Sequence, residues 1–105
     1  MTKEAFWTPD DQTIKNSNIY QMMLKNGLRT YENLWNWSVQ NKKDFWSQTI
    51  DNLGIEFQKP YKSIIDLSNG VENPRWLKGA KYNIVDSCFQ NDDKAVAIVF
   101  QKENG

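Results

Sequence analysis

Few residues of this chain could take part in catalysis, and they are widely spaced. Histidine is absent from the 105 residues, which removes the commonest general base, the commonest zinc ligand and every histidine-based triad. The one cysteine, Cys88, has no histidine to activate its thiol, and a structural zinc site needs more sulfur and nitrogen ligands than the chain contains. The sequence therefore predicts neither an activated thiol nor a zinc site.

The carboxylates, Ser38 and the glycines give no stronger indication of a catalytic or binding site. Asp44, Asp66 and Asp86 stand where helix caps or strand ends are expected, so a structural role accounts for each of them. No base can be assigned to Ser38. The five glycines are dispersed, and no glycine-rich phosphate-binding loop is present. We expect no catalytic, cofactor-binding or metal-binding residue in this chain.

Charge and hydropathy exclude further classes of function. Thirteen basic and thirteen acidic side chains cancel, and no long run of one sign occurs, so we expect no nucleic-acid partner and no anionic membrane. No segment approaches the roughly 20 apolar residues of a membrane span. A single cysteine fits a reducing compartment, and we expect a cytoplasmic protein.

Helical patterns fill the first half of the chain, up to about residue 54. Cap and stop residues divide this half into helices, because caps satisfy free backbone N–H groups and glycine tolerates the conformation that ends a helix. The caps that we predict are Thr8, Ser17, Thr30 and Asn41, and the stops are Gly27 and Gly54.

The clearest apolar stripe lies on the helix that begins after Asn41. Its members are Phe45, Trp46, Thr49, Ile50 and Leu53. This stripe predicts that Trp46 anchors the core, with Trp35 of the preceding helix also inside. Trp37 lies off the stripe, and we expect both Trp37 and Trp7 to be exposed or to meet another surface.

Short strands replace helices after Gly54. Residues 63–67 and 76–77 read as the two strands of a small hairpin across a loop rich in turn residues. Asn83 can cap a short helix, which we expect to turn its apolar residues inward; these are Ile84, Val85, Cys88 and Phe89.

The final apolar run, residues 95–100, reads as a buried strand. It is followed by Asn104-Gly105, a strong hairpin signal, and we expect the returning strand beyond Gly105. Without that partner the strand should fray or pair with a neighbouring molecule. The predicted fold class is α+β: a mainly helical N-terminal part, a short β-hairpin and a C-terminal apolar strand.

Two tryptophan-centred strings resemble a known family. The first is Tyr31…Leu34-Trp-Asn-Trp-Ser-Val39 with Phe45-Trp46, and the second is Trp76-Leu-Lys-Gly-Ala80 with Asn83. Together they resemble the N-terminal segment of acetyl-CoA synthetase-like enzymes, and the Trp-Ser-Val form is similar to the acetoacetyl-CoA synthetase branch. Leu77 and Tyr82 depart from the residues usual there. The matched positions are fold determinants, namely Trp35, Trp37, Phe45, Trp46, Trp76, Gly79 and Asn83.

The resemblance implies part of an AMP-forming acyl-CoA ligase. Such an enzyme joins a carboxylate to ATP as an acyl-adenylate, which CoA then captures, so ATP, Mg and CoA are implied for the parent enzyme and no cofactor for this stretch. Residues 1–105 would form one non-catalytic N-terminal domain, inactive alone, with the catalytic domains beyond the chain end. The implied partner is the catalytic domain of the same chain.

Two other functions remain open from the residues alone. One is a free-standing helical module that binds a protein through exposed aromatic side chains, and a weaker one is carbohydrate binding by surface tryptophans. Self-association through residues 95–100 is the alternative to an intramolecular partner.

Overall fold

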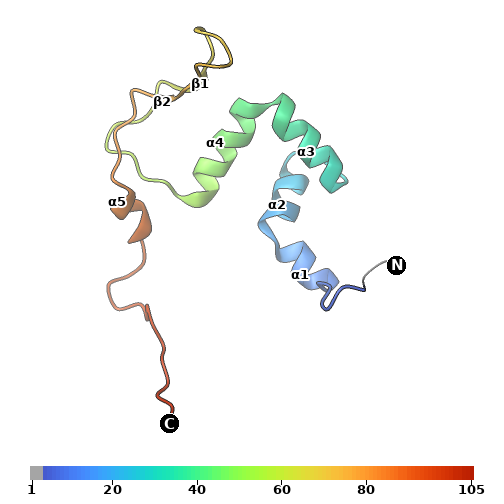
Figure 1. Ribbon diagram of the computed structural model, residues 1–105, viewed down its shortest axis with the longest axis vertical. Helices are drawn as coiled ribbons and strands as arrows, with labels where there is room; N and C mark the ends of the chain where they lie inside the picture. Colours follow the sequence, from blue (N-terminus) through green and yellow to red (C-terminus); the bar gives the residue numbers. More distant parts are fainter. Residues whose placement is uncertain (1–3) are drawn as a thin grey trace. The chain divides into compact units, whose positions relative to one another are not determined.

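The computed structural model describes residues 4–105, which divide into two compact units, one up to Trp46 and one from Ser47 on. In the described residues, five helices accompany a single two-stranded antiparallel sheet, and the predicted α+β class is confirmed (Figure 1). Each unit is described below by itself.

Short helices fill the chain up to residue 53. They are α1 (Asp11–Asn16), α2 (Asn18–Lys25), α3 (Tyr31–Gln40) and α4 (Lys42–Leu53). The predicted start of α1 at Thr8 is wrong by two residues, because the Asp10 carboxylate accepts the Thr13 N–H at 2.7 Å and so caps the helix itself.

The other helix boundaries follow local hydrogen bonds that the sequence predicts. Ser17 Oγ accepts the Tyr20 N–H at 3.2 Å and caps α2, and Thr30 caps α3 by the same type of bond. Gly27 and Gly54 end α2 and α4 with φ of 65° and 62°. Such positive φ suits glycine, which carries no Cβ to clash with the following carbonyl oxygen.

The second unit contains the predicted hairpin. Its strands are β1 (Ser63–Asp66) and β2 (Arg75–Lys78), and Ile65 is paired with Trp76. The pairing extends beyond the strands through Lys59 and Lys81, whose backbones exchange two hydrogen bonds of 3.0 and 2.9 Å. The short helix α5 (Ile84–Cys88) follows, capped by Asn83 as predicted.

Few side chains are buried in either unit. Leu34 is the buried apolar residue of the first unit, and Ile50, Ile64 and Ile65 are those of the second, among the residues that the structure describes. Ile64 and Ile65 are consecutive, so both faces of β1 are covered. The hairpin is therefore the best-packed part of the second unit.

The prediction that Trp46 and Trp35 lie in the core is wrong. Their side chains are 41% and 56% exposed, whereas Trp37, which we expected at the surface, is half-buried. Helical spacing shows which residues share a face, but burial needs a second surface opposite that face. Trp7, at 71% exposed, is at the surface as expected.

The predicted strand at residues 95–100 is not formed. The backbone carries no ladder there, and its apolar side chains are 75–88% exposed at Val96, Ile98, Val99 and Phe100. A strand needs a neighbour to bond its N–H and C=O groups. Within residues 4–105 no other strand runs beside this segment, which continues alone past α5 (Figure 1).

Candidate functional site

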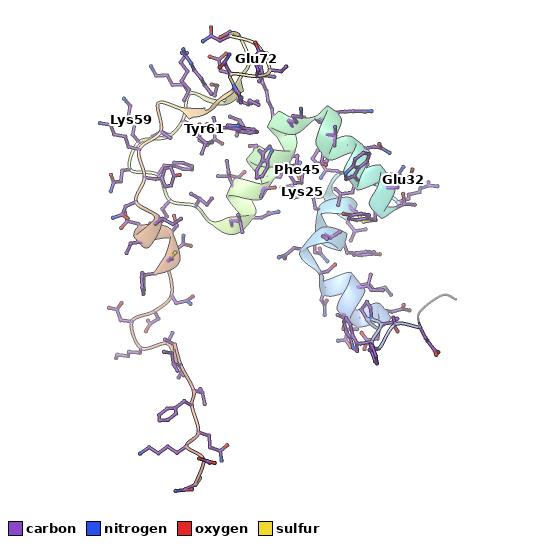
Figure 2. The ribbon with its side chains drawn as sticks, viewed as in Figure 1. Lys25, Glu32, Phe45, Lys59, Tyr61 and Glu72 are labelled. Atoms are coloured by element: carbon purple, nitrogen blue, oxygen red, sulfur yellow. The ribbon has the colours of Figure 1, made fainter. Side chains whose placement is uncertain are left out.

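Three aromatic rings of the first tryptophan string lie together in the first unit. The Trp37 and Phe45 ring centroids are 6.3 Å apart and those of Phe45 and Trp46 are 5.3 Å apart, both edge to face. Figure 2 labels Phe45, the middle ring of the three, on α4. Edge-to-face contacts of this kind stabilise by about 0.5–1.5 kcal/mol beyond area burial. The cluster holds α3 to the first turn of α4, and Trp35 takes no part in these ring pairs.

The second string forms the return strand of the hairpin and its exit. Trp76 is 47% exposed and stands opposite buried Ile65, and Gly79 has a φ of 82° in the turn closed by Ala80 N donating to Leu77 O at 3.0 Å. The Lys62 side chain lies beside Gly79 at ordinary van der Waals distance from where a Cβ would be. Gly79 thus has a backbone conformation that suits glycine, and its role as a fold determinant stays a prediction.

Leu77 carries backbone strain that the sequence did not indicate. Its φ of 47° is the one positive value outside glycine among the described residues, and it falls inside β2. A positive φ costs a residue with a Cβ roughly 1–2 kcal/mol. Leucine gives no local signal for a positive φ, and the residues on both sides of it, Trp76 and Lys78, are paired with β1.

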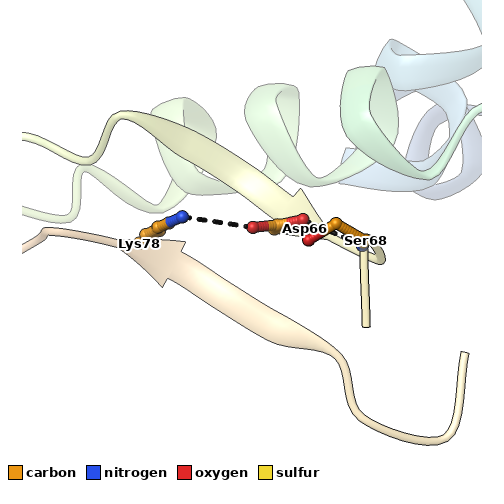
Figure 3. A network of polar contacts seen from close by, with 3 residues as sticks. All are labelled: Asp66, Ser68 and Lys78. Atoms are coloured by element: carbon orange, nitrogen blue, oxygen red, sulfur yellow. Dashed lines mark hydrogen bonds and ion pairs between the residues drawn. The ribbon is translucent and has the colours of Figure 1, made fainter. Parts of the chain in front are cut away.

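Asp66, Ser68 and Lys78 form a polar network at the end of β1 that leads into the hairpin loop (Figure 3). Asp66 Oδ1 accepts the Ser68 N–H at 2.9 Å, and Asp66 Oδ2 lies 3.3 Å from Lys78 Nζ on β2. The Ser68 N–H, then the Ser68 hydroxyl and then Lys78 lower the pKa of Asp66 from 3.8 to about 2. A carboxylate held ionised in this way is a poor general acid or base near neutral pH, and its role is structural.

Polar side chains of α5, and of Gln90 just after it, bind the segment that follows α4. Ser87 Oγ accepts the Glu56 N–H at 3.0 Å, Asp86 accepts from the Gln58 amide at 3.4 Å, and the Gln90 amide donates to Gly54 O. Residues 54–59 therefore run antiparallel to residues 81–90, in continuation of the hairpin. One side of α5 is occupied by these hydrogen bonds.

The apolar side of α5 faces away from the chain. Ile84, Val85 and Phe89 are 60%, 52% and 80% exposed, and Cys88 is also exposed. Our prediction that these residues point inward is wrong, because the polar residues at 86, 87 and 90 take the side that meets residues 54–58. The result is an amphipathic helix with its apolar face uncovered.

The last segment of the chain also exposes apolar side chains. We call the exposed apolar residues of α5 and of that segment the C-terminal apolar surface; its members are Ile84, Val85, Phe89, Val96, Ile98, Val99 and Phe100. Figure 2 shows side chains along the final segment with no second strand beside them. So many exposed apolar side chains in one stretch of sequence are characteristic of protein contact sites.

Other candidate sites carry little chemistry. A shallow open hollow near Cys88 is lined in part by Asp92, Asp93 and Val96, and Asp92 accepts the Lys94 N–H at 2.8 Å. In residues 4–105 no three of the Asp, Glu and Cys side chains come together as a metal site would need. None of the helices in that range is long and apolar enough to cross a membrane.

The family described as Acetyl-coenzyme A synthetase N-terminus matches residues 31–88. The match starts at the first residue of α3 and ends at the last residue of α5, so it includes both tryptophan strings and the hairpin. No solved structure matches the chain.

Curated relatives are CoA ligases by name. An acetoacetyl-CoA synthetase of Xenopus tropicalis is 27% identical over 110 residues, covering 100% of this chain and 16% of the relative. An acetoacetyl-CoA synthetase of Macaca fascicularis is 28% identical over 108 residues, covering 95% of this chain and 16% of the relative. A malonamoyl-CoA synthetase of Penicillium aethiopicum is 28% identical over 85 residues, covering 74% and 12%. The chain thus spans about a sixth of the length of the first two relatives.

Proposed function

Since the chain belongs to the acetyl-coenzyme A synthetase N-terminus family, we propose that it is the N-terminal part of an AMP-forming acyl-CoA synthetase. In this role the stretch itself is non-catalytic and binds no cofactor. ATP, Mg and CoA bind to the remainder of the enzyme. Residues 1–105 pack against its catalytic domain as one structural domain. A cytoplasmic location fits the single cysteine.

The single observation that carries the structural role is the uncovered apolar face of α5. A short helix held by hydrogen bonds on its polar side leaves Ile84, Val85 and Phe89 to water. Covering an apolar side chain contributes about 1.5–3 kcal/mol, so a partner that buried these three would be held firmly. The catalytic domain of the same chain is the partner that the length of the relatives supports.

The names of the relatives support a substrate class. Acetoacetyl and malonamoyl groups both carry a carbonyl at the third carbon, one in a ketone and the other in an amide. We propose that the substrate is a short carboxylic acid whose third carbon is a ketone or amide carbonyl, in preference to acetate. None of the described residues touches the acyl group in this proposal.

The activity is tested on the full-length protein. Acetoacetate, malonamate and acetate are each supplied with ATP, Mg²⁺ and CoA, and AMP and the thioester are quantified by chromatography and mass spectrometry. We expect AMP and acyl-CoA in equal amounts, most rapidly with one of the first two acids. Absence of thioester with all three acids and with longer acids would contradict the ligase assignment.

The docking role is tested with paired variants of the same full-length protein. Phe89→Asp places a charge on the apolar face of α5, and Val71→Asp places one at an equally exposed apolar position in the hairpin loop. We expect Phe89→Asp to lower the melting temperature and Val71→Asp to leave it unchanged. Equal melting of both variants and the wild type would contradict docking through α5.

A free-standing interaction module is the rival proposal, and the exposed rings of Trp7 and Trp35 favour it. The reading frame beyond Gly105 separates the two. A Ser/Thr/Gly-rich phosphate loop downstream supports the synthetase, and a stop codon directly after Gly105 supports the module.

A further inference from the structure

We propose that the hairpin carries an ionic docking site for an acidic surface of the catalytic domain of the same chain. Its cationic groups are Lys59, Lys62 and Lys81, which we call the hairpin lysine cluster. The inference rests on the proposed function, because it needs the remainder of the enzyme as the partner. It goes further by adding a contact whose chemistry differs from that of the apolar face of α5, and by stating the charge of the surface that the hairpin meets.

Two short stretches of sequence supply these lysines. Each stretch begins and ends with lysine and contains no acidic residue; they are Lys59-Pro-Tyr-Lys62 and Lys78-Gly-Ala-Lys81. The fold pairs them antiparallel, because Lys59 and Lys81 exchange two backbone hydrogen bonds and Lys62 N donates to Lys78 O at 2.8 Å. Four exposed lysines that the sequence keeps apart are thereby brought together at the hairpin, and Figure 2 labels Lys59 among them.

Only one of the four lysines is neutralised within the described residues. Lys78 Nζ lies 3.3 Å from Asp66 Oδ2, whereas Lys59, Lys62 and Lys81 form no ion pair with any described residue. Lys59 and Lys81 stand directly opposite each other, and like charges in that position of an antiparallel pair repel. The arrangement is unfavourable by itself, and carboxylates from another surface would turn the repulsion into attraction.

Aromatic contacts hold the two stretches in place. The ring centroid of Phe57 lies 5.4 Å from that of Tyr61 and 5.7 Å from that of Tyr82, and both contacts are edge to face. Tyr61 belongs to the first stretch and Tyr82 directly follows the second, so one ring contacts both. The stem of Lys62 also lies along Gly79, with Cγ, Cδ and Cε 3.6–3.9 Å from where a Cβ would be. Lysines on a backbone ordered in this way lose less freedom when a partner binds.

Exposure and net charge favour a protein surface as the partner. A small anionic ligand is held in a concave and mostly apolar site, whereas these lysines are exposed. Nucleic acid is bound by domains with a positive net charge and many phosphate contacts, yet the 105 residues have a formal net charge of zero. Three ammonium groups fit a local group of Asp and Glu side chains, and complementary charges of this kind fix the register of a contact.

The catalytic domain of the same chain is the occupant that the relatives support. Both lysine stretches lie inside the family match at residues 31–88, and the chain covers only 16% of the Xenopus relative. Most of the length of that relative therefore lies outside the matched stretch. A second copy of the chain fits less well, because a two-fold pair built around the cluster would set lysine against lysine.

Carbodiimide cross-linking of the full-length protein tests the inference directly. The reagent joins a carboxylate to a lysine amine without a spacer, so only groups in contact are linked, and mass spectrometry identifies the linked peptides. We expect links from the hairpin lysine cluster to Asp or Glu residues beyond Gly105, in amounts independent of protein concentration. Links confined to residues 1–105, or no links from the cluster while other lysines react, would overturn the inference. Links that vanish on dilution would overturn it too, and would indicate a second copy.

Variants of the full-length protein that remove charge test the sign of the effect. Lys59→Gln, Lys62→Gln and Lys81→Gln combined should lower the melting temperature at low salt. The difference should shrink in about 1 M NaCl, where the screening length falls to about 3 Å. A combined variant that melts at or above the wild-type temperature at low salt would overturn the inference, because relief of the repulsion between Lys59 and Lys81 would then be the whole effect.

A second combined variant controls for total charge. It replaces by glutamine three exposed lysines of the first unit, namely Lys15, Lys25 and Lys43. We expect its melting temperature to match that of the wild type at low and at high salt. An equal fall in this control would show a general effect of charge and would overturn the assignment to the hairpin.

Nucleic-acid binding and ligase activity give separate readouts. A full-length protein that binds a single-stranded oligonucleotide, and loses this binding in the variant of the hairpin lysine cluster, would overturn the inference in favour of a nucleic-acid partner. A protein that forms acyl-CoA but shows no link from the cluster to later residues keeps the proposed function and loses this inference. A protein that shows the links and forms no thioester loses the function, while the docking site stands.

Discussion

Asp66 on β1 pairs with Lys78 on β2 across the hairpin, although its direct partner in the strand register is Arg75. The 3.3 Å contact between Oδ2 and Nζ is therefore diagonal, and it leaves Oδ1 to accept the Ser68 N–H. The Asp66 carboxylate therefore connects the end of β1 both to the following turn and to Lys78, the last residue of β2.

This arrangement predicts a pH dependence in the acid range. The pKa of folded Asp66 is lowered from 3.8 to about 2 by Ser68 first and Lys78 second, so the stabilisation is complete above pH 3.8 and is lost as the pH falls through about 2. We expect a midpoint near 2 in a carboxyl ¹³C NMR titration of Asp66. Ser68→Pro, which removes the donated N–H, should raise this midpoint; an Asp66 midpoint near 3.8 in the wild type would contradict the network.

Gly79→Val should destabilise the chain by about 1–2 kcal/mol, because its φ of 82° is unfavourable for a residue with a Cβ. Steric contact adds little, since only the Lys62 side chain lies near the position of that Cβ. Lys81→Val is the control, as it adds a β-branched residue nearby where φ is not positive. Urea melts of both variants measure the difference, and similar losses would refute the backbone explanation.

Asn83→Ala should destabilise α5 by about 1 kcal/mol, because Asn83 Oδ1 accepts the Val85 N–H at 3.1 Å and so caps the helix. Asn83→Asp keeps an acceptor oxygen and should retain most of the stability. Hydrogen exchange across residues 84–88 reports on this helix. An alanine variant as well protected as the aspartate variant would show that the cap contributes nothing.

Ile50→Ala should cost roughly 2–4 kcal/mol, because Ile50 is 7% exposed and its removal leaves a cavity. Leu53→Ala, on the same helix at 65% exposed, should cost less than about 1 kcal/mol in residues 1–105. The comparison uses denaturant melts of the two variants. Equal losses would mean that burial does not separate these positions.

The Leu53→Ala variant also tests how much of the chain the catalytic domain would cover. If the full-length protein covers α4 as well as α5, Leu53→Ala becomes costly there while remaining mild in residues 1–105. The same pair of variants, measured in both lengths of chain, reports how far the contact surface extends beyond α5 along the helices.

The sequence alone determined the family, the α+β class and most element boundaries. The caps Ser17, Thr30 and Asn83 and the stops Gly27 and Gly54 stand where they were predicted. Each acts through hydrogen bonds or backbone conformation within a few residues, so local chemistry is enough to locate it. The hairpin was predictable for a similar reason, since two short β-forming stretches flank one loop.

Burial and orientation were decided only by the tertiary structure. The spacing of Trp35 and Trp46 predicted a core position, yet Trp37 is better covered than either, although Phe45 lies against both Trp37 and Trp46. The apolar face of α5 points outward because distant residues 54–58 bind its polar side. A side chain is buried only when a surface remote in sequence lies opposite it, and the strand at residues 95–100 fails to form within this chain for want of such a partner.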